Sequence, residues 1–254
     1  MSAAPEPRAA SEWAALDAAL DAALAPWWGE PRPISLLFSG GVDSSLLALE
    51  LGRRRAVELV TIGLAGSHDL AAAESAAGAL GLPWTPRPVS LEELRSWARR
   101  RAPLLGDLPA TPRAVLVGLG LAVEAASHPV VLVGQGPDEL FLGYAHFREL
   151  TGTAALARVG DDLRVARELW ARLEAIVGGP DRSIAAPYLS PPFVAAASAV
   201  PVDRRREGGV PKGLFRRFAV HRGLPEALAA RPKRAFQYGS GVDRALRPPA
   251  RPPR

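Results

Sequence analysis

The stretch Phe38-Ser39-Gly40-Gly41-Val42-Asp43-Ser44-Ser45 decides the fold of this chain. It follows an apolar run at residues 34–38 and precedes the apolar residues 46–51, so it predicts a strand, a glycine turn and a helix over residues 45–54. Two glycines let the backbone approach a ligand closely, and the helix points its N-terminal amides at an anion. A lysine does not follow the glycines, which excludes the G-x-x-x-x-G-K-S/T loop of the common nucleoside triphosphatases. An ordinary glycine turn is the alternative, and the acid and serine pair after the glycines favour an anion site.

The composition excludes several classes of protein. The chain has 254 residues, 48% of them hydrophobic and 22% charged, and can form one large domain or two small ones. It contains no cysteine, which excludes disulfides, thiolate zinc sites and a cysteine nucleophile and fits a reducing compartment. No apolar run approaches a membrane span, and residues 1–8 lack the apolar core of a signal peptide. We therefore expect a cytoplasmic protein without a membrane partner.

The net charge is +5, and arginines gather late in the chain, at residues 204–206, 216–217 and 247–254. Such clusters can bind nucleic acid, but the aromatic residues that would stack on bases are not interleaved with them. We therefore expect a solvated surface and a disordered Pro/Arg tail at residues 244–254, and not nucleic acid as the main partner.

Strands and helices alternate through residue 145. Further strands are expected at residues 58–63, 84–89 and 130–133, the second of them at a sheet edge because it contains prolines. The predicted helices are one capped by Ser11 that ends near residues 27–29, and others at residues 70–80, 91–101 (with a capping box of Ser90 and Glu93) and 115–126, with a Pro-rich turn at 103–112. This order predicts an α/β fold, a doubly wound parallel sheet with right-handed crossovers.

Beyond residue 150 the pattern changes. Residues 161–177 predict an amphipathic helix, and the rest of the C-terminal third is expected to be a layer of helix and loop that covers the sheet. The organisation expected is an N-terminal extension with a packing helix (1–33), an ATP-binding domain (34–243) and the tail (244–254).

A second glycine-rich motif follows the strand at residues 130–133. It reads Gly134-Gln135-Gly136-Pro137-Asp138-Glu139-Leu140-Phe141-Leu142-Gly143-Tyr144. In open α/β sheets ligands bind at the carboxyl ends of strands, so Asp43 and Asp138 are expected to project from neighbouring strand ends. Two carboxylates suit Mg²⁺, which binds few protein ligands and shares phosphate oxygens. The alternative is that the acids only stabilise a helix N-terminus.

These motifs carry a resemblance to a known family. The S-G-G-x-D-S pattern resembles the pyrophosphate loop of the ATP pyrophosphatase (PP-loop) superfamily. The second motif is similar to G-E-G-x-D-E-L/V-F-x-G-Y of the asparagine synthetase family, in its C-terminal synthetase domain. Residues 62–70, 212–216 and 231–241 agree with that family in order and spacing, so the match spans about residues 12–243.

The resemblance implies roles for individual residues. Asp43 and Asp138 would hold Mg²⁺, and Lys233 would neutralise charge that grows on the phosphates in the transition state. A solvated surface lysine is the alternative for Lys233. The residues implied in holding pyrophosphate are Ser39, Gly40, Gly41, Asp43, Ser44 and Ser45, and those implied around the rest of the ATP are Phe38, Ile62, Gly63, Val133 and Gly134.

Three departures qualify the resemblance. Gln135 stands where the family carries a catalytic carboxylate, and an amide cannot be a general base, so water, substrate or another residue would take that step. Ala185 and Ser190 replace an Arg and an Asp of the family. The family's glutamine-hydrolysing domain, with its N-terminal cysteine, has no counterpart in residues 1–33, so ammonia is expected free or from a separate glutaminase subunit.

The resemblance implies an ATP-dependent, AMP-forming amide ligase. An aspartate-like carboxylate would be activated as an acyl-adenylate, and ammonia or an amine would displace AMP. One alternative is a PP-loop enzyme that acts on another carboxylate or a nucleotide, as NAD synthetase, GMP synthetase and thiolating tRNA enzymes do; the lack of cysteine argues against the thiolating kind. Another is a non-catalytic ATP-binding regulatory subunit, which Gln135 would suit.

Overall fold

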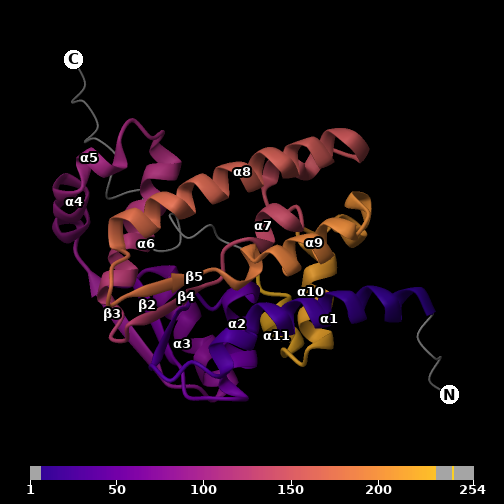
Figure 1. Cartoon of the computed structure of the whole chain (residues 1–254), viewed down its shortest axis with the longest axis horizontal. Helices are drawn as coiled ribbons and strands as arrows, with labels where there is room; N and C mark the ends of the chain where they lie inside the picture. The colour runs from indigo at the N-terminus through magenta and orange to yellow at the C-terminus, as the bar shows by residue number, and fades with distance from the viewer. Residues whose placement is uncertain (1–6, 233–241, 243–254) are drawn as a thin grey trace.

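The computed structural model describes residues 7–232 and residue 242, and Figure 1 shows a sheet with helices on both sides. The strands are β1 (Ile34–Leu37), β2 (Glu58–Leu64), β3 (Trp84–Val89), β4 (Val130–Val133) and β5 (Ser183–Ala185). The α-helices are α1 (Pro7–Trp28), α2 (Val42–Gly52), α3 (His68–Leu80), α4 (Leu91–Arg100), α5 (Ala102–Leu105), α6 (Ala110–Ala125), α7 (Pro137–Leu140), α8 (Gly152–Val177), α9 (Pro191–Ala199), α10 (Gly213–His221) and α11 (Glu226–Ala229). Short 3₁₀ turns are η1 (Ala145–Glu149), η2 (Pro187–Leu189), η3 (Val202–Arg204) and η4 (Glu207–Gly209).

All five strands are parallel, in the order β3-β2-β1-β4-β5. The chain builds the sheet outward from β1 on one side and then from β4 on the other, so the winding direction changes between β1 and β4. This confirms the predicted α/β, doubly wound parallel sheet. In such sheets the crevice at this change of direction is where ligands bind.

Both faces of the sheet are buried, because successive side chains on a strand point to opposite faces. On β4, Val130 and Leu132 join one core cluster, while Val131 and Val133 join the other. Helices α1, α2, α3 and α9 to α11 supply the first cluster, and α4 to α6 supply the second. Helix α8 contributes to both, because its first half packs in one cluster and its last turns in the other. A wholly apolar four-residue strand is thus explained by burial on two sides.

Most predicted elements are present, and the differences have local causes. The capping box at Ser90 and Glu93 is confirmed, and β3 lies at an edge as predicted. The first helix begins at Pro7 and not at Ser11, because proline fits the first turn of a helix, where its missing N–H is not needed. The predicted turn at residues 103–112 is wrong: it contains α5 and the start of α6, each with a proline in its first turn or at its N-cap.

The C-terminal part differs more. Helix α8 begins at Gly152, well before the predicted residue 161. The expectation of helix and loop alone after residue 150 is wrong, because β5 adds an edge strand to β4. Three residues are too short to show a strand periodicity in sequence.

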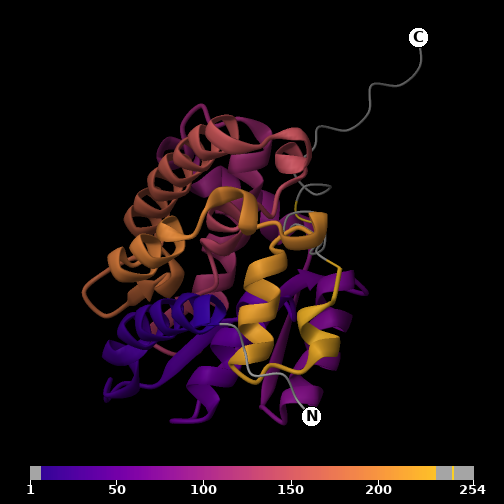
Figure 2. The same cartoon turned by 90° about the vertical axis from the view of Figure 1, so that its right-hand side faces the viewer.

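Helices α10 and α11 lie side by side, as Figure 2 shows, and both contact α2. No helix in the described part of the chain is long and apolar enough to cross a bilayer.

The packing of α6 on α4 makes a testable prediction about Gly120. A Cβ atom at Gly120 would lie 2.3 Å from the ring of Trp97, which is fully buried and donates a hydrogen bond to Glu124. Ala normally stabilises a helix interior relative to Gly, but here the ring cannot move away, so Gly120→Ala should lower the free energy of unfolding by about 1–3 kcal/mol. Gly160→Ala in α8, where a Cβ meets nothing within 4 Å, should instead raise it by about 0.5–1 kcal/mol. Urea unfolding of both variants measures the difference, and equal effects would contradict the packing.

Candidate functional site

The loop between β1 and α2 is held by hydrogen bonds among its own residues. The backbone N–H of Ser39 donates to Ser44 Oγ at 3.2 Å, and Ser44 Oγ donates to the carbonyl of Gly41 at 3.3 Å. Helix α2 begins at Val42, so the prediction of a helix from residue 45 is wrong; Gly41 is its extended N-cap and accepts the first helical bond, from Ser45 N–H. No side chain caps this helix end among the described residues. Its first amides are therefore suited to an anion.

Gly40 lets the loop lie directly against α3. Its φ is +71°, and a Cβ there would lie 2.5 Å from the carbonyl oxygen of Ala72. Arg231 fixes the same contact from outside, because its Nη1 donates to the carbonyls of Gly40, at 3.2 Å, and Ala72, at 2.6 Å. Sequence reasoning gave Arg231 no role.

The loop after β4 is shaped by two further glycines. Gly136 has φ +122° and passes close to Tyr188, and Gly143 lies under the carboxylate of Asp138, where a Cβ would be 2.0 Å from Asp138 Oδ1. The N–H of Gly143 donates to the carbonyl of Asp138 at 2.8 Å. Between them Leu142 has φ +56°, a conformation that L residues adopt rarely. This backbone holds the Asp138 side chain in one direction.

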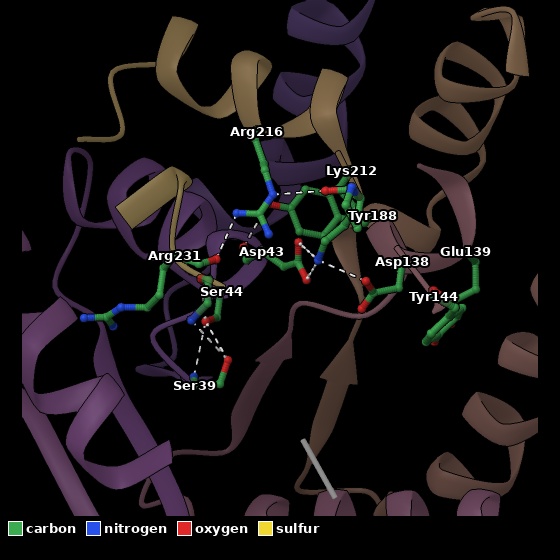
Figure 3. A network of polar contacts seen from close by, with 12 residues as sticks. Ser39, Asp43, Ser44, Asp138, Glu139, Tyr144, Tyr188, Lys212, Arg216 and Arg231 are labelled. Atoms are coloured by element: carbon green, nitrogen blue, oxygen red, sulfur yellow. Dashed lines mark hydrogen bonds and ion pairs between the residues drawn. The ribbon is translucent and has the colours of Figure 1, made fainter. Parts of the chain in front are cut away.

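The two loops meet because β1 and β4 are neighbours. Leu37 pairs with Val133 in the parallel register, so the residues after each strand emerge side by side. The carboxylates of Asp43 and Asp138 both contact the ammonium of Lys212, which Figure 3 shows between them. Lys212 Nζ lies 2.9 and 2.7 Å from the two Asp43 oxygens and 3.0 Å from Asp138 Oδ1. Asp43 and Asp138 therefore project from neighbouring strand ends, as the sequence predicts.

Lys212 is the main residue that sequence reasoning missed. Burial lowers the pKa of its ammonium, and the charges of Asp138 and Asp43 raise it by more, so its pKa lies above the ordinary value and the side chain is charged. The sequence does hold a signal: only two of the 31 Lys and Arg residues are lysine, Lys212 and Lys233. Tyr188 was also missed; it is fully buried and donates from its hydroxyl to the carbonyl of Asp43 at 3.0 Å.

A hollow opens between the two loops, next to the end of β2. Most residues implied by the resemblance line it: Phe38, Ser39, Gly41, Asp43, Ser44, Ile62, Val133, Gly134, Gln135 and Asp138. Three others do not: Gly40 lies behind it against α3, Ser45 is fully buried in α2, and Gly63 packs against Ser67. Thr61, Asp69, Arg216 and Arg231 line it as well. Lys233 lies outside the described residues.

A second and larger hollow adjoins the first. Gln135, Asp138, Arg216 and Pro232 line both. The larger one also includes Glu139 and Tyr144, whose hydroxyl donates to Glu139 Oε1 at 2.6 Å. Gln135 therefore stands at the junction of the smaller hollow and the wider one.

The carboxylates of this site fit magnesium only if other oxygen ligands share the ion. Two carboxylates that converge on one ammonium can also converge on a metal ion. In the part of the chain that the structure describes, no group of three or more His, Cys, Asp or Glu side chains could hold a metal. Phosphate or water oxygens would therefore have to complete the shell, which is the usual mode of Mg²⁺ at nucleotide sites.

Comparison with known proteins identifies the family. A family model described as asparagine synthase matches residues 15–178 and 183–251, so the chain belongs to the asparagine synthase family, an ATP-using family of the ligase type. The chain is 26% identical over 253 residues to a Methanocaldococcus jannaschii protein provisionally named a glutamine-hydrolysing asparagine synthetase, and 26% identical over 225 residues to the glutamine-hydrolysing asparagine synthetase of Gallus gallus. These matches cover 84% and 82% of this chain but 47% and 40% of the relatives, so the chain spans less than half of their length.

Among solved structures, the NH₃-dependent NAD synthetase of Campylobacter jejuni superposes with a TM-score of 0.39 and 15% identity, covering 80% of this chain and 96% of that one.

A matched pair of variants can separate two effects on stability at Gly40, the close approach to α3 and the positive φ. Gly40 and Gly66 both have φ +71°, but a Cβ at Gly66 meets nothing within 4 Å. Each Gly→Ala change should cost about 1–2 kcal/mol of unfolding free energy for the left-handed conformation. Gly40→Ala should cost more and should also weaken ATP binding, because the loop must leave α3. Calorimetric ATP titration with thermal unfolding tests this; equal stability of the two variants would show that the contact with Ala72 does not matter.

Proposed function

We propose that the chain activates a carboxylate with ATP and transfers it to an amine, as an AMP-forming amide ligase. One observation carries the proposal: Asp43 and Asp138, on adjacent loops at the change of winding direction, share one cation beside an uncapped helix N-terminus. Such a site has anion-binding amides and metal-binding carboxylates within reach of one triphosphate. Family membership supports the same reaction class.

In the first step a carboxylate oxygen attacks the α-phosphorus of ATP. The bond between that phosphorus and the oxygen that bridges the α- and β-phosphates breaks, and pyrophosphate leaves. Ser39, Ser44 and the first amides of α2 would hold the pyrophosphate, and Phe38, Ile62 and Val133 would line the adenosine. Asp43 and Asp138 would hold magnesium, which when bound neutralises phosphate charge. Arg216, which lines both hollows, and Lys233 would add positive charge.

In the second step the amine nitrogen attacks the acyl carbon, the carbon–oxygen bond to AMP breaks, and the nitrogen loses a proton to water or to the phosphate of the departing AMP. Gln135 cannot accept that proton, because an amide has no basic site near neutral pH. The step therefore depends on alignment of the reactants more than on a protein base. We propose aspartate as the carboxylate and ammonia as the amine, since the relatives are named as asparagine synthetases.

We propose that the nitrogen comes from outside these 254 residues. The two relatives named above are described as glutamine-hydrolysing, and this chain has no cysteine to serve as a glutaminase nucleophile. We propose that it uses free ammonia or ammonia from a separate glutaminase subunit, and that it works in the cytoplasm.

ATP–pyrophosphate exchange tests the proposal directly. With Mg²⁺ and a panel of carboxylic acids that begins with aspartate, the wild-type protein should exchange labelled pyrophosphate into ATP only when its acid is present. Asp43→Asn should lower the exchange rate by about 100-fold or more, because the site loses one of its two carboxylate charges toward the metal.

The matched control is Asp107→Asn, which changes an exposed aspartate away from the site and should leave the exchange rate unchanged. Circular dichroism should show that both variants are folded. ATP binding without exchange for any acid would identify a non-catalytic nucleotide-binding subunit, and full exchange by Asp43→Asn would refute the assigned loop.

A further inference from the structure

The ammonium of Lys212 is held by both carboxylates of the site: it donates hydrogen bonds to the two Asp43 oxygens and forms an ion pair with Asp138. An ammonium has three donors, and Nζ contacts three carboxylate oxygens at 2.7 to 3.0 Å. The Lys212 side chain is 2% exposed, whereas those of Asp43 and Asp138 are 19% and 18% exposed. Lys212 is therefore more deeply buried than the two carboxylates, and its ammonium lies between them (Figure 3).

The backbone at Lys212 is held in an unfavourable state. Its φ is +57°, and Leu142 is the one other non-glycine residue with positive φ in the described part of the chain. Lys212 is also the N-cap of α10, where the helix dipole disfavours a cation. The next residue, Gly213, lies so close to η4 that a Cβ would be 2.5 Å from the carbonyl oxygen of Glu207. Lys212 and Leu142 therefore both have a strained backbone, and both lie beside the same site. Backbone strain that gathers at one site points to a functional role.

The choice of lysine is itself unusual in this chain. Arginine supplies its other basic side chains through residue 232, including the buried Arg205, which donates to three backbone carbonyls. A guanidinium is a wide planar fork, whereas an ammonium is a compact point charge. Only the compact group can stand where a metal ion would stand between two carboxylates.

We propose that Lys212 is the resident cation of the Asp43–Asp138 pair and excludes a free divalent ion from it, so that magnesium enters the site only together with the triphosphate. The pair and the ammonium have a net charge of −1. A Mg²⁺ ion binds oxygen at about 2.0–2.1 Å, so it cannot occupy the same point without displacing the ammonium of Lys212, whose side chain is 2% exposed. A triphosphate brings both additional negative charge and additional oxygens, which offset the second cation. The inference rests on the proposed function only for the identity of the nucleotide.

Manganese binding, followed by electron paramagnetic resonance, tests the proposal without any turnover. The wild-type protein should bind no stoichiometric Mn²⁺ at millimolar concentration on its own, and should bind it when a non-hydrolysable ATP analogue is added. Lys212→Met should gain a nucleotide-independent Mn²⁺ site that is about 10-fold to 100-fold tighter than any in the wild type. Adding Asp138→Asn to Lys212→Met should remove that site, and Lys212→Arg, which keeps the charge, should not gain it.

Two outcomes would overturn the proposal: a nucleotide-independent Mn²⁺ site in the wild type that Asp43→Asn removes, or a folded Lys212→Met that gains none. If Lys212→Met does not fold, Lys212→Gln provides the neutral variant, and the wild-type titration decides by itself. Failure of pyrophosphate exchange in the wild type, with the manganese results as expected, would reject the ligase function and leave the role of Lys212 standing.

Discussion

Three charged side chains from distant parts of the chain meet at one buried point, and the site depends on their contact. The ammonium of Lys212 joins Asp43, 169 residues away, to Asp138. Charges removed from water are costly unless they are paired, and breaking such a pair leaves an uncompensated charge. The contact therefore ties the loop after β1, the loop after β4 and the start of α10 into one unit.

The backbone contributes as much to the site as the charges do. Gly40 lets the first loop rest on α3, and Gly143 leaves room for the carboxylate of Asp138. A methyl group at either place would collide with a group that the site needs. Glycine at these points allows the close approach, and Arg231 adds hydrogen bonds that keep the first loop in place.

The site is rich in charged groups and poor in groups that can act as a general base. Gln135 stands at the junction of the two hollows and offers no basic atom. The proposed ligase reaction would work by holding anionic reactants together and by balancing their charge, and the charged groups that line the smaller hollow with Gln135 include Asp43, Asp138, Lys212 and Arg216. Membership of the asparagine synthase family supports a reaction of the ligase type.

Sequence alone determined the elements whose signal lies within a few neighbouring residues. The apolar runs of β1, β2 and β4, the prolines of the edge strand β3 and the capping box of α4 each carry a signal within a few residues. The order of strands and helices then determined a parallel, doubly wound sheet, and the two glycine motifs follow adjacent strands β1 and β4. Local signals failed for β5, which is three residues long, and for α5, whose proline reads as a turn in sequence.

Only the tertiary structure decided what stands between the two carboxylates. Lys212 belongs to a short basic segment that sequence could not connect with Asp43, because an ion pair between residues so far apart leaves no periodic trace. The scarcity of lysine in an arginine-rich chain was a visible signal, but its meaning depended on where the side chain points. Folding brings the ammonium to the two acids because the β1–β4 register sets the two loops side by side and α10 begins beneath them.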